Sequence, residues 1–346
     1  MIDFRYHLVS IVAVFLALAI GIVLGSTELQ GPAFSLLDKT TSKLQSELGQ
    51  VSSQRDAAQQ QATEGELYAQ AVEPAVLRDL LTGRRLLIVT EPGAQSSVVS
   101  GITTAAIQAG ASVTGEINLQ PKFFDASGTA QDSLNQTTLD VAQTAGLQLD
   151  TSATYQQQAA QVIASEILTT SSAPAGGQPG GDQSANAATM LQAYAASQFL
   201  STSGQPATPA TLAVVVTPQS APADGSADQL AQVLIPLVQE LAAKSAATVV
   251  VGSSTGSGAG SPISVLRSNS VASQVSTVDD ADLAAGQTVA MQALAVELAG
   301  GKAGSYGFTA NGATAIAPSP APTPSASASA TPSSSSTSTK KKKASR

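Results

Sequence analysis

The chain has 346 residues, 43% of them hydrophobic, which is enough for one sizeable domain or two small ones. It contains no cysteine, so disulfides and thiolate metal sites are excluded. The formal net charge is −8, but five of the 16 basic residues stand in an acid-free C-terminal tail, Lys340–Lys343 and Arg346. The remaining 11 basic and 24 acidic residues give the rest of the chain a net charge of −13. A body this acidic is a poor partner for nucleic acid.

The first apolar segment, Leu8–Gly25, reads LVSIVAVFLALAIGIVLG and carries no charged side chain. As a helix it spans about 27 Å, close to the roughly 30 Å hydrocarbon core of a bilayer. We therefore predict a single transmembrane helix at 8–25, with Leu8, Phe15, Gly21 and Gly25 among its anchor residues. Gly21 and Gly25 form a small-xxx-small pair that would let two helices pack closely, although glycine is also common in membrane helices generally.

A cleaved signal peptide is the alternative interpretation of this segment. The N-terminal residues 1–7 balance Arg5 against Asp3, so their basic bias is weak. The small-x-small pattern at Ala17–Ala19 lies inside the apolar run, where cleavage would split it. A retained anchor is therefore favoured. Because Arg5 precedes the helix and Glu28 is the first charge after it, the positive-inside rule predicts a cytoplasmic N-terminus and an extracytoplasmic body in the cell envelope.

A second pattern follows the anchor, in which apolar residues recur at alternating steps of three and four. This spacing is typical of the a/d seam of a coiled coil. The seam residues that carry the prediction are Phe34, Leu37, Leu44, Leu48 and Val51. We predict a coiled-coil stalk over 34–72 that forms a parallel homodimer and ends before Pro74, which limits continuation. The alternative is a single amphipathic helix packed on its own domain.

The remainder of the chain alternates short apolar runs with helix-compatible segments. This order predicts an α/β fold, Rossmann-like with a mainly parallel sheet, over residues 84–308. Expected strands are 86–90, 112–119, 212–217, 248–251 and 275–278. Expected helices are 96–109, 125–146, 157–170, 191–200, 227–244 and 283–298, with Pro236 tolerated only near an end or a kink. The Gly/Pro/Ser/Ala segment 171–188 is expected to be a loop, and the Ala/Pro/Ser/Lys tail 309–346 to be disordered.

The residue inventory restricts the chemistry of the body. The sole histidine, His7, stands at the membrane edge, so a Ser/His/Asp or histidine–metal mechanism in the body is excluded. Copper(I) prefers cysteine and methionine sulfur. Beyond Met1 the chain offers only Met190 and Met291, which we expect to be core residues. No catalytic residue or cofactor site is predicted, metal ligands are left unassigned, and we expect a protein that is not an enzyme.

Two segments carry weaker signals. The glycine-rich loop Gly252–Gly260 follows a strand and could approach a phosphate, but it matches no nucleotide-binding motif, so a plain loop is favoured. Asp279, Asp280 and Asp282 cluster before a helix. We expect Asp280 or Asp282 to cap that helix, with a hard-cation site as the alternative. The lysine tail would either solubilise the chain or contact acidic polymer or lipid.

The opening MIDFRYHLVSIVAVFLALAIGIVLG resembles that of the mycobacterial copper transport protein B (MctB) family, which includes the SteB-type proteins. The segment VDDADLAAGQTVAMQALAVELAGGKAGSYGF resembles the family's closing segment, so the resemblance covers about residues 1–308. It implies a membrane-anchored actinobacterial envelope protein linked to copper efflux or homeostasis and described as pore-forming. The SteB-type relatives imply instead a role in cell separation, in complex with a SteA-like membrane partner and bearing on peptidoglycan hydrolysis.

Two function hypotheses follow. From the resemblance, the protein serves copper export or homeostasis, with copper as a ligand by resemblance alone. From the residues, it is a non-enzymatic assembly protein whose stalk and domain bind envelope partners, as in cell separation. The missing sulfur and imidazole ligands favour the second hypothesis. A third, an enzyme working with carboxylates alone, is the weakest. The body also lacks the repeated ten-residue alternating strands of an outer-membrane barrel, so a pore rests on the resemblance.

Overall fold

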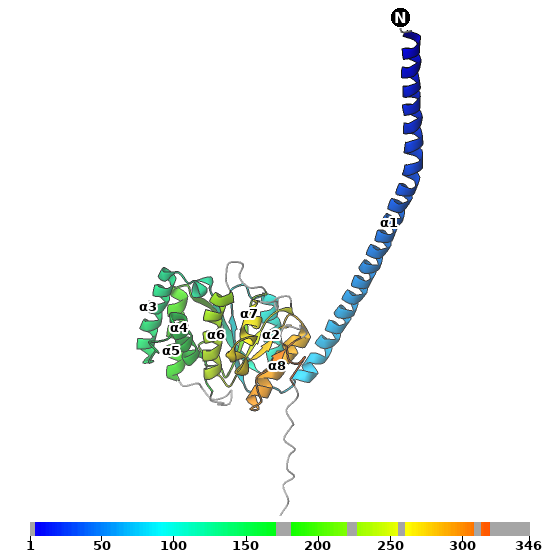
Figure 1. The fold of residues 1–346 in the computed structure, drawn as a ribbon. Helices are drawn as coiled ribbons and strands as arrows, with labels where there is room; N and C mark the ends of the chain where they lie inside the picture. The colour runs from blue at the N-terminus through cyan, green and yellow to red at the C-terminus, as the bar shows by residue number, and fades with distance from the viewer. Residues whose placement is uncertain (1–3, 171–180, 220–226, 255–259, 308–312, 319–346) are drawn as a thin grey trace, which may run out of the picture. The chain divides into compact units, whose positions relative to one another are not determined.

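A computed structural model describes residues 4–170, 181–219, 227–254, 260–307 and 313–318. Its contacts divide the chain into two compact units, Met1–Ala71 and Val72–Arg346, and each is described by itself below. The first unit is most of one long helix, α1 (Phe4–Leu77), and the second is an α/β domain (Figure 1).

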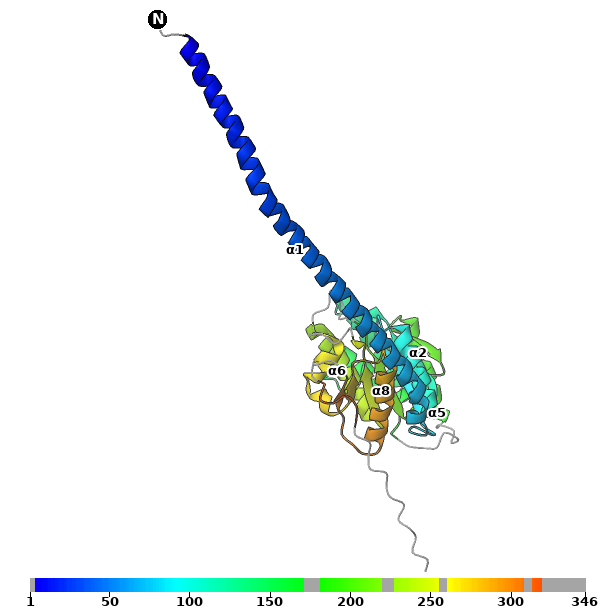
Figure 2. The ribbon, with the colours of Figure 1, turned by 90° about the vertical axis from the view of Figure 1, so that its right-hand side faces the viewer.

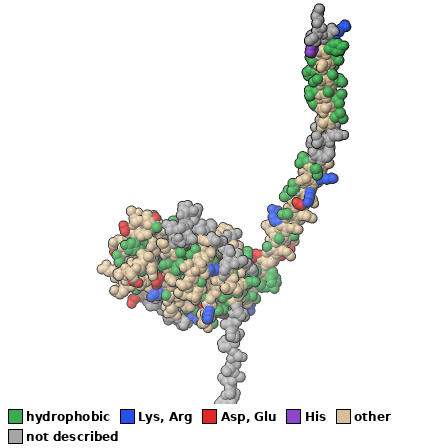
Figure 3. Space-filling model, viewed as in Figure 1, with side chains coloured by type: hydrophobic (Ala, Val, Ile, Leu, Met, Phe, Trp, Pro, Cys, Tyr) green, Lys and Arg blue, Asp and Glu red, His purple; other side chains and the backbone are tan. Residues whose placement is uncertain are grey.

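Helix α1 begins with the apolar anchor segment. Residues Arg5–Gly25 have a mean hydropathy of 2.9 and are long enough to cross a membrane, and none of this window is buried by the rest of the chain. Hydrophobic side chains surround this part of the helix in Figure 3. These properties suggest a membrane anchor, since an apolar helix satisfies its own backbone groups in lipid. The tract after it is rich in Gln, Ser, Glu and Lys and stays helical through Gly65.

The end of α1 lies three residues beyond Pro74. The sequence predicted that this proline would limit the helix. The helix nevertheless continues past Pro74 to Leu77, because Leu77 is completely buried and fixes the last turn in the core of the domain. Proline removes one hydrogen bond of the helix ladder, and the burial of a leucine offsets a loss of that size.

The described residues of the second unit form one seven-stranded sheet in the order β3-β2-β1-β4-β5-β6-β7. All neighbouring strands are parallel except β2 and β3. The strands are β1 (Arg85–Thr90), β2 (Ser112–Leu119), β3 (Leu200–Gly204), β4 (Leu212–Val216), β5 (Ala247–Val251), β6 (Ser276–Val278) and β7 (Ser305–Tyr306). Every residue of β1, β4 and β5 is buried, as expected for parallel strands covered on both faces.

Helices cover both faces of this sheet. One face packs on α3 (Gly128–Ala145), α4 (Tyr155–Ile167), α5 (Gly181–Ala196), α6 (Ala227–Lys244) and α7 (Pro262–Arg267), of which α3, α4 and α5 lie together in Figure 1. The other face packs on α2 (Ser96–Gln108) and α8 (Ala284–Leu298), which are turned toward the viewer in Figure 2. Short 3-10 turns are η1 (Pro121–Phe124) and η3 (Ser270–Ser273).

The two cores follow from the alternation along each strand. In β1, Leu87 and Val89 point to the first face while Leu86 and Ile88 point to the second. Valine, leucine and alanine fill both layers, with the aromatic rings of Tyr194, Phe123 and Phe199 buried in the first. The predicted α/β class with a mainly parallel sheet is therefore confirmed.

Some predicted elements differ from the observed ones. The expected loop over 171–188 is wrong for residues 181–188, because α5 begins at Gly181; residues 171–180 lie outside the described residues. Ala187, Met190 and Tyr194 are completely buried and give this helix a packing face that its alanine-rich sequence conceals. The expected helix over 191–200 ends at Ala196, and β3 follows as an edge strand that the sequence did not predict. Pro236 lies inside α6, away from either end.

The outer edge of the sheet at β7 is formed by residues for which the sequence predicted neither a helix nor a strand. Strand β7 pairs with β6 through Ser305 and Tyr306. Thr314 then donates its backbone N–H to the Ser305 carbonyl at 2.8 Å, and Ala315 bridges to Tyr306. The tail residues 319–346 lie outside the described residues.

Candidate functional site

The carboxyl ends of the parallel strands meet at one edge of the sheet, which we call the carboxyl edge. Chain order runs from β1 outward to β2, whereas β4 runs on to β5 in the opposite direction. In such sheets ligands bind outside the carboxyl ends at the point where strand order reverses, here between β1 and β4. The residues that follow the strands at this edge include Glu91 after β1, Thr217 after β4, Ser254 after β5 and Asp279 after β6. The carboxyl edge is therefore the first candidate for a ligand site.

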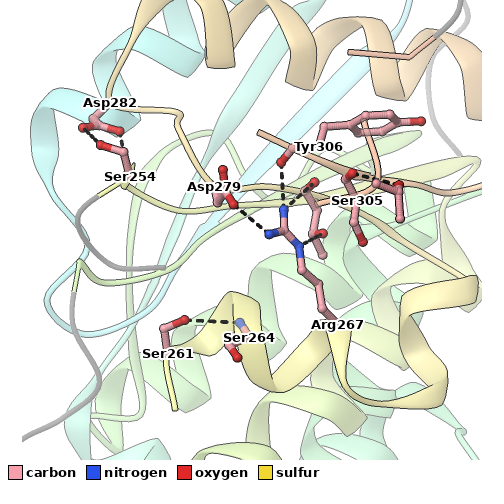
Figure 4. Close-up of polar contacts among 10 residues, drawn as sticks. Ser254, Ser261, Ser264, Arg267, Asp279, Asp282, Ser305 and Tyr306 are labelled. Atoms are coloured by element: carbon pink, nitrogen blue, oxygen red, sulfur yellow. Dashed lines mark hydrogen bonds and ion pairs between the residues drawn. The ribbon is translucent and has the colours of Figure 1, made fainter. Parts of the chain in front are cut away.

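Arg267 makes the most extensive polar contacts at the carboxyl edge (Figure 4). Its Nη1 lies 2.7 Å from Asp279 Oδ2, its Nη2 donates to the Tyr306 carbonyl at 2.7 Å, and its Nε donates to Thr277 Oγ1 at 2.9 Å. The side chains of Arg267 and Asp279 are 5% and 0% exposed. A Cβ at Gly307 would clash with Asp279 Oδ1. The ion pair therefore ties α7, β6 and β7 together and is a structural clamp.

The neighbouring aspartates have separate environments. Asp280 is buried, and this burial, reinforced by the charge of Asp279, raises the pKa of Asp280 to about 7. Asp282 accepts hydrogen bonds from the Ser254 N–H and hydroxyl, both at 2.8 Å, and so ties the start of α8 to the end of β5 (Figure 4). Asp279 and Asp282 thus have different protein partners.

The expected helix cap is wrong. The N-cap of α8 is Leu283 and makes no side-chain capping hydrogen bond, because Asp282 is occupied by Ser254. The alternative, a hard-cation site, has no support either, since the described residues contain no group of three or more His, Cys, Asp or Glu side chains placed to hold a metal. Residues 255–259 of the glycine-rich loop lie outside the described residues. At its start, a Cβ on Gly252 would come within 3.0 Å of Ile263 and Thr217, so this part of the loop packs into the domain.

Glu91 is a buried carboxyl group that the sequence did not single out. It is 3% exposed at the end of β1, next to Pro92, and its backbone N–H donates to the Val216 carbonyl at 3.0 Å. Burial raises the pKa of Glu91 to about 8. Its Oε1 has no hydrogen-bond partner among the described residues. The sequence did contain a signal for this group, because a charged residue directly follows an unbroken apolar strand. The pattern TEPG, however, indicated only a turn.

Met190 and Met291 are core residues, as predicted. Met190 in α5 and Met291 in α8 are completely buried and belong to the cores on opposite faces of the sheet. The sheet itself therefore separates the two sulfur atoms. His7 lies in the exposed first part of α1. The fold thus brings no pair of preferred copper(I) ligands together within the described residues.

The predicted anchor and seam residues all lie on α1. Leu8 and Phe15 are exposed, and a Cβ at Gly21 or Gly25 would meet no atom within 4 Å. The seam residues Leu37, Leu44, Leu48 and Val51 are 52–68% exposed, and the side chain of Phe34 lies outside the described residues. The described anchor and seam side chains are therefore exposed. The coiled coil stays a prediction, since only one chain is present.

A family model and several named relatives match most of this chain. A family model described as "Copper transport outer membrane protein, MctB" matches residues 1–318. Proteins named Copper transporter MctB from Mycobacterium tuberculosis and Mycobacterium bovis are 28% identical over 317 residues, which cover 91% of this chain and 99% of each relative. The protein of the same name from Mycobacterium leprae is 27% identical over 325 residues, with the same coverage. These relatives are named as transporters, not enzymes. With its apolar N-terminal helix, its parallel α/β domain and a family match that runs to residue 318, the chain belongs to the MctB family.

Proposed function

We propose that this protein is a single-pass envelope protein that serves copper homeostasis as a membrane-anchored assembly unit and does not carry copper itself. The observation that carries the proposal is the contrast between the α/β domain, which buries its own core, and the seam of α1, which exposes Leu44, Leu48 and Val51. A continuous exposed apolar stripe on a polar helix is a protein-binding surface.

The copper part of the proposal comes from the family. Relatives named as copper transporters align over nearly their whole length. The chemistry of this chain supports an indirect role, because Met190 and Met291 are buried on opposite faces of the sheet and the chain has no cysteine. Copper(I) needs sulfur or imidazole ligands that can approach one another. We therefore assign copper binding to a partner protein and no cofactor to this chain.

The first partner is a second copy of the chain. Two copies anchored by Arg5–Gly25 in one membrane have their α1 helices parallel, the orientation that an a/d seam requires. Around the seam, α1 carries i,i+4 contacts suited to a solvated helix, such as Lys43 with Glu47. With Arg5 before the membrane segment, we place the N-terminus in the cytoplasm and the α/β domain in the envelope.

A second candidate function uses the same surfaces. A SteB-like assembly protein would bind a SteA-like membrane partner through the stalk or domain and regulate peptidoglycan hydrolysis during cell separation. The exposed seam supports this candidate as strongly as the first, because neither depends on a metal ligand in this chain. In both, the protein is not an enzyme.

Two experiments test the proposal. Calorimetric titration of the full chain in nanodiscs with Cu(I) and Cu(II) is expected to show no binding tighter than about millimolar, the regime of nonspecific contacts. Submicromolar binding would contradict the indirect role.

The second experiment is purification from the native envelope with and without Leu44→Asp plus Leu48→Asp. We expect a membrane partner to be retained by the natural chain and lost by the variant. The matched control, Ser46→Asp plus Gln50→Asp, adds the same charge beside the seam and is expected to keep the partner. Sensitivity of the deletion strain to copper, or failure of its cells to separate, then distinguishes the two candidate functions.

A further inference from the structure

A second feature of the carboxyl edge is a cavity of about 420 Å³ on the face covered by α3 to α7. Its walls come from η1, which follows β2, from the start of α4 and from the first turns of α6, which follows β4. Helix α4 runs away from this edge, since Leu168 beyond its end pairs with Ala210 just before β4 begins. The cavity therefore lies on the carboxyl side of the sheet, where ligands bind in α/β folds of this kind.

The lining is neutral and amide-rich. Among the described residues that line the cavity, none is charged. Polar groups are supplied by Gln131, Thr151, Gln156 and Gln232. An amide side chain offers two donors and one acceptor oxygen, and a hydroxyl offers both functions. This set suits a neutral ligand with many hydroxyl or acetamido groups and lacks the lysine or arginine that would hold a phosphate.

Much of this hydrogen-bonding capacity is uncommitted. Gln131 donates to the Ala126 carbonyl at 3.2 Å through its Nε2, which leaves its Oε1 as an acceptor. Within the described residues, the side chains of Thr151, Gln156 and Gln232 make no hydrogen bond to the protein. Their placement around one hollow gives a ligand several partners at once.

Two aromatic rings complete the lining. Phe124 packs edge-on against the completely buried Phe123, with ring centroids 5.8 Å apart, so its ring is held in place. Tyr155 begins α4 and is 37% exposed. Aromatic faces stack on apolar C–H surfaces, and a pyranose ring presents such a surface on one side with hydroxyls around its rim. A volume of about 420 Å³ accommodates one to two sugar rings, within the usual range of small-molecule sites.

We propose that this cavity binds a neutral carbohydrate, with Tyr155 and Phe124 as stacking platforms and Gln131, Gln156 and Gln232 as hydroxyl partners. This inference stands on the cavity alone and does not depend on the proposed copper or assembly function.

The test uses the full chain in nanodiscs, because glycoside detergents would compete for the site. The probes are chitotetraose and maltotetraose as neutral oligosaccharides and inorganic phosphate as the anionic comparison. Saturation-transfer NMR and calorimetry are expected to show one of the oligosaccharides binding with Kd on the order of 0.1–1 mM, as expected for a half-open site whose hydrogen bonds compete with water. Phosphate is expected not to bind.

Variants locate the binding in the cavity. Tyr155→Ala is expected to weaken binding about tenfold and Gln232→Ala about threefold. The controls Tyr68→Ala and Gln143→Ala remove the same kinds of side chain from exposed positions that do not line the cavity, and are expected to leave Kd unchanged. Circular-dichroism melts verify that each variant is folded. No oligosaccharide binding at about 10 mM, binding of phosphate in its place, or an unchanged Kd in both cavity variants would overturn the proposal.

Discussion

Leu48 in α1 and Leu241 in α6 are the same side chain on two helices, yet Leu48 is 68% exposed and Leu241 is completely buried. The α/β domain covers its own apolar residues with helices on both faces of the sheet. In the first unit, by contrast, the described side chains of the anchor and of the seam residues Leu37, Leu44, Leu48 and Val51 are exposed. Burial of apolar surface is the main favourable term in folding. The domain therefore buries its own apolar side chains, and the exposed anchor and seam support our proposal that lipid and another protein cover α1.

The largest expected effect concerns the clamp inside the domain. Arg267→Met leaves the buried carboxylate of Asp279 without its ion-pair partner, and such a loss costs about 3–5 kcal/mol of unfolding free energy. Denaturant unfolding of the full chain, followed by near-UV circular dichroism of the domain, measures it. Lys302→Met removes an exposed cation from the segment just before β7 and is expected to cost less than about 0.5 kcal/mol. Equal effects of the two variants would mean that the clamp does not hold the domain.

The comparison between the two leucines can be made directly. Leu241→Ala opens a cavity in the core and is expected to destabilise the domain by about 2–5 kcal/mol. Leu48→Ala is expected to change the same domain transition by less than about 0.5 kcal/mol. The two variants delete identical atoms, so any difference in the unfolding midpoint reports environment alone. A domain destabilised as strongly by the α1 variant would show that the seam packs on its own domain.

The buried carboxyl groups predict a pH dependence of the domain. Burial raises the pKa of Glu91 from 4.5 to about 8, so the folded state holds this proton more tightly than the unfolded state. The contribution of Glu91 to the unfolding free energy is fully present below about pH 4.5. It falls by up to about 1.4 kcal/mol per pH unit between pH 4.5 and 8, and it does not change further above pH 8. Asp280 acts in the same direction between pH 3.8 and about 7.

The variant Glu91→Gln isolates this effect, because glutamine has no proton to lose. Its unfolding free energy is expected to decline less than that of the natural chain between pH 5 and 8, with Asp280→Asn flattening the lower part of that range. Denaturation at fixed ionic strength across this range measures both. Parallel pH profiles for the natural chain and Glu91→Gln would contradict the buried environment of this group.

The smallest expected effect concerns sulfur. Met190→Leu and Met291→Leu are volume-conserving changes in separate cores and are expected to cost less than about 1.5 kcal/mol each. Neither is expected to alter the response of the purified chain to copper, since the sheet separates the two side chains. A copper-induced rise in melting temperature that either variant abolished would assign copper binding to this chain after all.

The elements that the sequence predicted best are those whose signal is local. LLIVT and LAVVV are apolar runs bounded by Pro or Gly, and both are central strands of the sheet. The 227–244 helix matched α6 because its amphipathic pattern outweighs Pro236. The edge strand β3 was missed because in LSTSG only Leu200 is buried, so the segment carries no hydrophobic pattern.

The polar sites were less predictable, because their environments come from residues distant in sequence. Glu91 is buried by elements that follow it, including the strand that contains Val216. The Arg267 clamp needs Tyr306, 39 residues later. The cavity combines Phe124, Tyr155 and Gln232, three segments whose proximity depends on the order of strands in the sheet. Periodicity indicates the seam of α1, and the surface that we propose to cover it belongs to a second copy of the chain.

The most direct test of that covering surface is the mass of the full chain in nanodiscs or a non-denaturing detergent, measured by light scattering after size-exclusion chromatography. We expect twice the chain mass of 34.5 kDa for the natural protein and for Ser46→Asp plus Gln50→Asp, and a single mass for Leu44→Asp plus Leu48→Asp. A natural chain that is monomeric at micromolar concentration, or a seam variant that remains dimeric, would contradict the proposal that a second copy completes α1.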